Sequence, residues 1–249
     1  TSSYNSTSLR NTLSFQALPK IFGAFRYAGI GNDDRLYYNS SGYTTWDRSF
    51  DLRVDLLNQT NLLPDVTLGF QDVLGTGIYS SEYLVASKSI FSNLKSTIGI
   101  GWGRLGTANV ISNTGSRNTN TGGNSGGLLR YGSFFKGSYG LFGGLEYNLR
   151  YPNMTLQLEV SSDNYDDESS LIKKSPTSNI NYGIHYPFSD NFGLSAYRKN
   201  GHEIGLQFNL NINPNTYGIS SYLEGAPEPF YSSPINFKKS SVYQEKIST

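Results

Sequence analysis

The chain has 249 residues, of which 37% are hydrophobic and 16% are charged, and it contains 27 glycines, 19 tyrosines and no cysteine. Its net charge of +1 gives no long-range field that attracts a polyanion, so we expect no nucleic acid among its partners. Without cysteine there is no disulfide framework and no thiolate metal site, and no stretch approaches the roughly 20 consecutive apolar residues of a transmembrane helix.

Apolar and polar residues alternate in one segment after another. A period of two places successive side chains on opposite faces of a strand, as in 203–213, where Ile204 and Leu206 share one face and Gly205 and Gln207 the other. The alternation predicts eleven strands, at residues 12–18, 21–29, 46–57, 64–73, 82–89, 94–103, 137–149, 153–162, 178–187, 190–198 and 203–213. Most have the roughly 9 to 11 residues that a tilted strand needs to cross a bilayer.

The predicted connections are of two kinds. The long ones are 30–45, 104–136 and 163–177, and the short ones include 19–20, 90–93, 150–152 and 188–189. The two kinds fall on opposite ends if 74–81 and the tight 199–202 turn are placed with the long loops. This asymmetry is typical of outer-membrane barrels, so we predict an all-β, antiparallel transmembrane β-barrel of about 12 strands over residues 1–213, with the long loops outside.

Eleven strands cannot close an antiparallel barrel, because the first and last would run in the same direction. We therefore expect one further strand, either before Thr1 or unrecognised in the pattern, and we expect the chain to be part of a longer protein. The alternation stops after Asn213, and residues 214–249 are rich in proline, serine and lysine. We predict that they form a periplasmic tail or linker.

The segment at 51–88, DLRVDLLNQTNLLPDVTLGFQDVLGTGIYSSEYLVASK, resembles the central signature of the YjbH family, and FRYAGI at 25–30, TIGIGWGRLG at 97–106 and, more loosely, PEPF at 227–230 extend the resemblance. Members of that family are outer-membrane barrel proteins associated with exopolysaccharide or capsule production, and they are often longer. The resemblance implies a location in the outer membrane of a Gram-negative bacterium. It also implies outer-membrane lipid, an exopolysaccharide and other secretion or envelope proteins as partners, and no catalytic residue.

Polar residues on the predicted interior face are the candidates for a functional lining. They are Arg26, Asp51, Arg53, Asp55, Glu82, Lys88, Lys95, Glu146, Glu159, His185 and Tyr197. Because a barrel of this size has a narrow interior, we expect ion pairs across the lumen to fill it. The alternative is a selectivity lining of an open channel, and if an oligosaccharide passes, these groups would line its route.

Two further groups of residues have both a structural and a functional interpretation. Gly75, Thr76, Gly77, Ser80, Ser81 and Glu82 are expected to form a tight bend that uses glycine at positive φ, and a glycan-contacting turn is the alternative. The aromatics Tyr27, Trp46, Tyr83, Trp102, Tyr147 and Tyr186 are expected to form an outward-facing belt at the membrane interface, and sugar-stacking platforms are the alternative.

We expect no enzyme activity and no cofactor. His185 and His202 are the only histidines, and their spacing suggests no serine with a histidine held beside it by a third group. The leading hypothesis is a non-enzymatic barrel for export or surface organisation of an exopolysaccharide. The alternatives are a structural or adhesive surface scaffold anchored by the barrel, and a narrow passive porin.

Overall fold

The computed structural model describes residues 1–5, 8–30, 45–117, 129, 131–165 and 176–213. The strands are β1 Ser2–Asn5, β2 Ser8–Leu18, β3 Ile21–Ile30, β4 Thr45–Leu57, β5 Asp65–Gln71, β6 Ser81–Phe91, β7 Leu94–Gly103, β8 Val110–Asn113, β9 Ser138–Leu149, β10 Met154–Val160, β11 Ile180–Pro187, β12 Phe192–Lys199 and β13 Glu203–Leu210. Two 3-10 turns, η2 (Arg104–Gly106) and η3 (Tyr131–Ser133), lie between β7 and β9. No helix in the described part is long and apolar enough to span a membrane.

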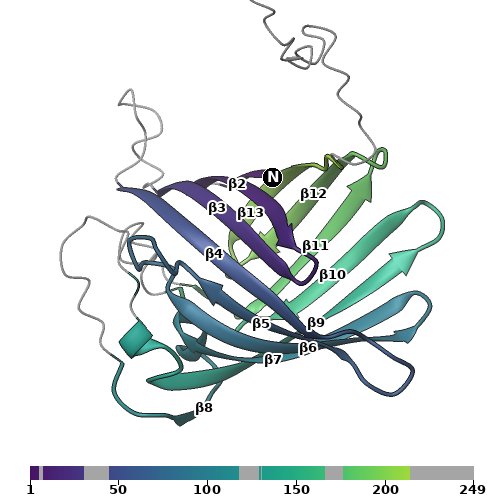
Figure 1. The fold of residues 1–249 in the computed structure, drawn as a ribbon. Helices are drawn as coiled ribbons and strands as arrows, with labels where there is room; N and C mark the ends of the chain where they lie inside the picture. Colours follow the sequence, from purple (N-terminus) through teal and green to yellow (C-terminus); the bar gives the residue numbers. More distant parts are fainter. Residues whose placement is uncertain (6–7, 31–44, 118–128, 130, 166–175, 214–249) are drawn as a thin grey trace, which may run out of the picture. The chain divides into compact units, whose positions relative to one another are not determined.

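The strands form one closed antiparallel barrel (Figure 1). The sheet has 13 strands, and with the short β8 set aside, 12 strands close into a ring through the β1–β13 pair. β8 pairs with the first residues of β9, from Ser138 to Gly140, beyond the residues of β9 that pair with β10. The predicted 12-stranded fold is confirmed, and β1 is the closing strand that the parity of eleven strands required.

The distribution of side chains is the reverse of that in a water-soluble protein. Large apolar residues lie on the exterior, and Leu13 and Ile204 are each 68% exposed. The fully buried groups are mostly polar, and on the interior face they include Asp47, Ser81 and Glu203. An apolar exterior around a polar interior is typical of barrels that sit in a lipid bilayer.

The connections sort by end as predicted. The described flanks of the long connections β3–β4, β7–β9 and β10–β11 lie at one end of the barrel, which we call the long-loop end, together with the β5–β6 and β12–β13 connections. The turns β2–β3, β6–β7, β9–β10 and β11–β12 lie at the opposite, short-turn end. Residues 31–44, 118–128 and 166–175 of the predicted loops, and the predicted tail 214–249, lie outside the described residues.

Candidate functional site

The β5–β6 connection folds into the interior at the long-loop end. Residues 72–80, which we call the inward segment, are organised by Asp72, whose Oδ2 accepts hydrogen bonds from the backbone N–H groups of Gly77 (2.7 Å) and Tyr79 (3.1 Å). Gly77 has a φ of 93°, as expected for a tight bend. The predicted bend is therefore present, and it also carries Tyr79, which is 3% exposed, among side chains of the barrel interior.

Three guanidinium groups surround the Tyr79 ring. The Cζ atoms of Arg26 and Arg104 lie 4.5 Å from the ring centroid, and that of Arg10 lies 5.2 Å from it. Nη2 of Arg10 also donates to the Tyr79 hydroxyl at 3.3 Å. A cation over a desolvated ring contributes about 0.5–2 kcal/mol. The ring thus joins β2, β3 and η2 across the interior.

The contacts continue from Arg104 to side chains of β12 and β13. Arg104 forms an ion pair with Asp163 and lies 5.4 Å from the centroid of the Tyr165 ring. Lys199 on β12 lies over the same ring at 5.4 Å and pairs with Glu203 on β13 at 3.2 Å. These contacts and those of Tyr79 form the cross-barrel cluster, whose members are Arg10, Arg26, Tyr79, Arg104, Asp163, Tyr165, Lys199 and Glu203. The cluster spans the interior at the long-loop end.

Predicted charges on β3 and β4 do face the interior, but they pair along the wall. Arg26 and Asp51 are 3.3 Å apart on neighbouring strands. Arg53 and Asp55 are 3.7 Å apart on one strand, and Thr67 donates to Asp55 at 2.9 Å. The expectation that these pairs would cross the lumen is wrong, because a short carboxylate reaches an adjacent strand more readily than the far wall. The cross-barrel cluster makes that crossing instead.

The predicted inward and outward faces of β6 are exchanged in the structure. Glu82 and Lys88 lie opposite Trp102 and Ser96 of β7, on the face that carries the exposed Leu84. Both therefore lie on the outer face, where Lys88 donates to backbone carbonyls of the β4–β5 turn. The same register turns Tyr83 inward, so its assignment to the outer belt is also wrong. The other predicted belt residues lie on the outer face: Tyr27, Trp46, Trp102, Tyr147 and Tyr186.

Glu82 is 1% exposed because the segment after β8 covers it. Arg117 binds both of its carboxylate oxygens, at 2.7 and 2.9 Å, and the backbone N–H of Phe135 donates to it at 3.1 Å. Phe135 also packs edge-on against Phe70 and Trp102. This outer latch, formed by Glu82 and Arg117, fastens the β7–β9 connection to the barrel wall.

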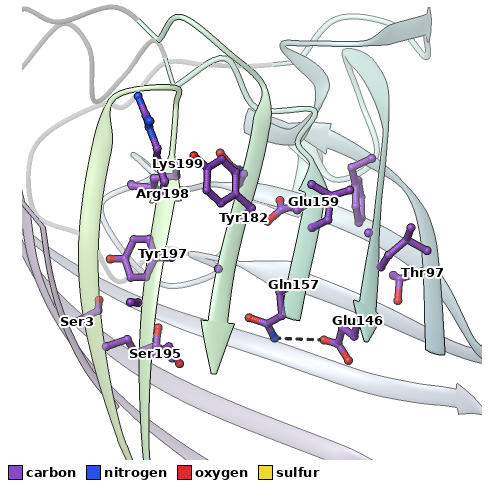
Figure 2. A pocket seen from close by; sticks show the side chains of 18 of the residues that line it. Ser3, Thr97, Glu146, Gln157, Glu159, Tyr182, Ser195, Tyr197, Arg198 and Lys199 are labelled. Atoms are coloured by element: carbon purple, nitrogen blue, oxygen red, sulfur yellow. Dashed lines mark hydrogen bonds between the residues drawn. The ribbon is translucent and has the colours of Figure 1, made fainter. Parts of the chain in front are cut away.

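A cavity of about 510 Å³ lies in the interior along β9 to β13 (Figure 2). The predicted residues Glu146, Glu159 and Tyr197 line it. Lys95 lies opposite Glu146 in the β7–β9 register, on the same interior face. Three uncharged groups that sequence analysis did not single out also line the cavity: Gln157, Ser195 and Gln207. They occupy interior-facing positions in the alternating pattern of their strands, and this pattern could have identified them.

His185 faces the interior on β11, and its Nδ1 lies 2.9 Å from the Ser195 hydroxyl. In the part of the chain that the structure describes, no carboxylate forms an ion pair with His185, and no three metal-ligating side chains form a cluster. Nucleophilic catalysis by serine needs a histidine oriented by a third group. His185 and Ser195 therefore form a hydrogen bond between two neighbouring strands of the barrel wall.

Asp72 makes the inward segment sensitive to pH. Burial raises the pKa of its carboxyl to about 6, and the charge of Asp47 adds to the rise. Since the folded state then binds the proton more strongly than the unfolded state, the stabilisation is fully present below the unfolded value of 3.8 and is lost as pH rises through about 6. The corresponding difference is about 3 kcal/mol. Among the described residues, Oδ1 of Asp72 is buried without a hydrogen-bond partner and can hold the proton.

We expect Asp72→Asn to remove most of this pH dependence, because the amide is neutral at every pH and asparagine tolerates the φ of 55° found here. Thermal unfolding in detergent at pH 5 and pH 7.5 measures the effect. The parent protein should be more stable at pH 5, whereas the variant should show a much smaller difference. Asp190→Asn, in the β11–β12 turn, is the control and should keep the parent's difference. An unchanged difference in Asp72→Asn would contradict the assignment.

The comparisons with known proteins agree on one family. The family model described as "Exopolysaccharide biosynthesis protein YbjH" matches residues 1–248. The uncharacterized lipoprotein YjbH of Escherichia coli (strain K12) is 32% identical over 230 residues, which are 87% of this chain and 32% of that protein. This chain therefore spans about a third of that relative's length.

Among solved structures, the KdgM porin in complex with disordered oligogalacturonate has a TM-score of 0.40 and 11% identity, covering 84% of this chain and 96% of the porin chain. A similarity this distant carries no argument about function. The family match extends over nearly the whole chain and confirms the resemblance seen at 25–30, 51–88 and 97–106. The chain belongs to the YjbH family.

Proposed function

We propose that this chain is a non-enzymatic outer-membrane β-barrel that takes part in the export or surface organisation of an exopolysaccharide. The observation that carries the proposal is the closed barrel with its apolar exterior and polar interior. Such a surface is stable in a bilayer and unfavourable in water. The description of the family as an exopolysaccharide biosynthesis protein supplies the process.

The cross-barrel cluster argues against a passive porin. A porin needs a continuous polar path, whereas here Tyr79 and the side chains around it occupy the interior at the long-loop end. Export would then require the inward segment to move. The second candidate is a surface scaffold, and the side chains that occupy the long-loop end of the interior favour it.

Deleting the gene in the parent bacterium separates the two roles. Under the export role, secreted and cell-bound polysaccharide should both fall, and the intact gene should restore them. Under the scaffold role, total output should stay constant while the cell-bound share falls. Membrane fractionation of the same cells should recover the protein with the outer membrane. Unchanged amounts of both polysaccharide fractions, or a protein that stays in solution without detergent, would contradict the proposal.

A further inference from the structure

We infer that the interior cavity is a saccharide-binding site in which Tyr197 is the stacking platform, and that it takes a neutral, hydroxyl-rich oligosaccharide. The inference deepens the proposed function and rests on it. The cavity volume of about 510 Å³ falls in the range of about 300–1,000 Å³ that is usual for small-molecule sites. A short segment of an oligosaccharide therefore fits within it.

The Tyr197 ring lies against the barrel wall because its neighbour on β13 is a glycine. A Cβ built on Gly205 would lie 2.3 Å from Cζ of Tyr197 and 2.5 Å from its hydroxyl oxygen, closer than real contacts allow. Only the absence of a side chain at Gly205 permits the ring to cover that strand. Tyr197 also lines the cavity, so one side of the ring lies on the wall and the other faces the cavity (Figure 2).

The same construction recurs at β7 and β9. A Cβ on Gly99 would lie 2.3 Å from Cζ of Phe142, and Phe142 lines the same cavity. A Cβ on Gly69 would lie 2.0 Å from Cζ of Tyr83, whose ring meets that of Phe142 edge-on at 6.3 Å. Interior aromatic rings thus lie over glycines of neighbouring strands at three places around the barrel. Rings held flat offer apolar faces of the kind on which planar or C–H-rich ligands pack.

The polar side chains that line the cavity can form hydrogen bonds with the hydroxyl groups of a sugar. Gln157 Nε2 and Glu146 Oε1 are 3.5 Å apart across the β9–β10 pair, which places an amide beside a carboxylate (Figure 2). Ser195 lies two residues before Tyr197 on the same face of β12, opposite Gln207 of β13. Amides and hydroxyls both donate and accept hydrogen bonds, whereas carboxylates accept them. Neighbouring sugar hydroxyls need both functions.

The charges select against an acidic polymer. The carboxylates of Glu146 and Glu159 line the cavity together with the cations of Arg10, Arg198 and Lys199. These cations already have partners, since Arg10 donates to Tyr79, Arg198 donates to the carbonyl of Gly201 and Lys199 pairs with Glu203. An anionic sugar would meet two carboxylates and compete for those cations. A neutral saccharide avoids both penalties.

Binding to the full protein in detergent tests the inference. Maltohexaose and cellohexaose are the neutral probes and hexagalacturonate is the acidic one, each titrated by calorimetry. We expect at least one neutral probe to bind about tenfold more tightly than the acidic one. Tyr197→Ala should weaken the binding of that probe by about tenfold, because the ring on which the sugar packs is lost. Gly205→Ala, which keeps the tyrosine but pushes its ring off the wall, should weaken binding similarly.

Gly23→Ala is the matched control. Its new Cβ would lie 2.7 Å from Cζ of Phe15 and displaces a ring on the outer face, so binding should not change. The inference fails if neither neutral probe binds, if hexagalacturonate binds more tightly, or if Tyr197→Ala and Gly205→Ala bind as the parent does. Polysaccharide output from the deletion strain tests the proposed function without any binding measurement, so the two failures are distinguishable.

Discussion

Replacing residues 72–80 by an Asn-Gly turn should raise the conductance of the barrel in a planar bilayer by at least about tenfold, because it removes the inward segment, whose Tyr79 lies among interior side chains at the long-loop end. Gln71 and Ser81 are direct partners across β5 and β6, so a two-residue type I′ turn can close the hairpin between them. The change leaves the guanidinium groups of the cross-barrel cluster around the opening. Because carboxylates pair with Arg26, Arg104 and Lys199, we expect little selectivity between anions and cations in the open form.

Tyr79→Phe is the control for the shortened connection. It retains the ring over which Arg26 and Arg104 lie and removes only the hydroxyl that Arg10 contacts. Its conductance should stay at the parent level. If the shortened barrel folds and conducts no better than the parent, the inward segment is not what closes the interior.

Most of the barrel could be predicted from the sequence because lipid on one side and polar groups on the other impose a strict period of two. All eleven predicted strands are present, with shifted ends such as 8–18 in place of 12–18. β1 was missed because its sequence, SSYN, is four residues long and Tyr4 is its only apolar residue. A strand of four residues is too short to show alternation. Its existence nevertheless followed from the even number of strands that a closed antiparallel barrel needs.

The phase of β6 could not be predicted from its own sequence. Both faces carry apolar residues, with Leu84 and Ala86 on one and Tyr83 and Val85 on the other. The pattern therefore predicts an interior position for a charge at the strand end, such as Glu82. The structure shows it outside, where Arg117 neutralises it from 35 residues away in the sequence. An ion pair between a strand end and a distant connection produces no periodic pattern in the sequence.

The interior cluster escaped prediction for a related reason. Arg104, Asp163 and Tyr165 follow strands that end at the long-loop end, and Tyr79 lies in a connection. In the sequence such residues fall in the predicted loops, whereas the predicted lining lies on strands. The strand residues Glu146, Glu159 and Tyr197 do line the cavity, because their place depends only on alternation. Contacts that depend on how a connection folds back require the structure.

The outer latch should contribute strongly to stability, since removing one member of a buried ion pair typically costs about 3–5 kcal/mol. We expect Glu82→Ala to lower the free energy of unfolding by about this amount, because it leaves the buried Arg117 charge without its counter-ion, with only the Ser133 carbonyl and the Ser80 hydroxyl as acceptors, and the Phe135 N–H without its acceptor. Guanidinium titration in lipid vesicles, followed by tryptophan fluorescence, measures the loss by linear extrapolation. Trp102, which contacts Phe135, is a reporter at the site.

Lys88→Ala is the matched control, because Lys88 lies on the same strand and face but makes exposed hydrogen bonds. It should cost less than about 1 kcal/mol. Adding Arg117→Leu to Glu82→Ala should recover part of the loss, since no unpaired buried charge remains in the double variant. If Glu82→Ala costs no more than Lys88→Ala, the latch does not hold the connection to the wall. The burial of Glu82 would then have to be maintained by the aromatic packing of Phe135 against Phe70 and Trp102.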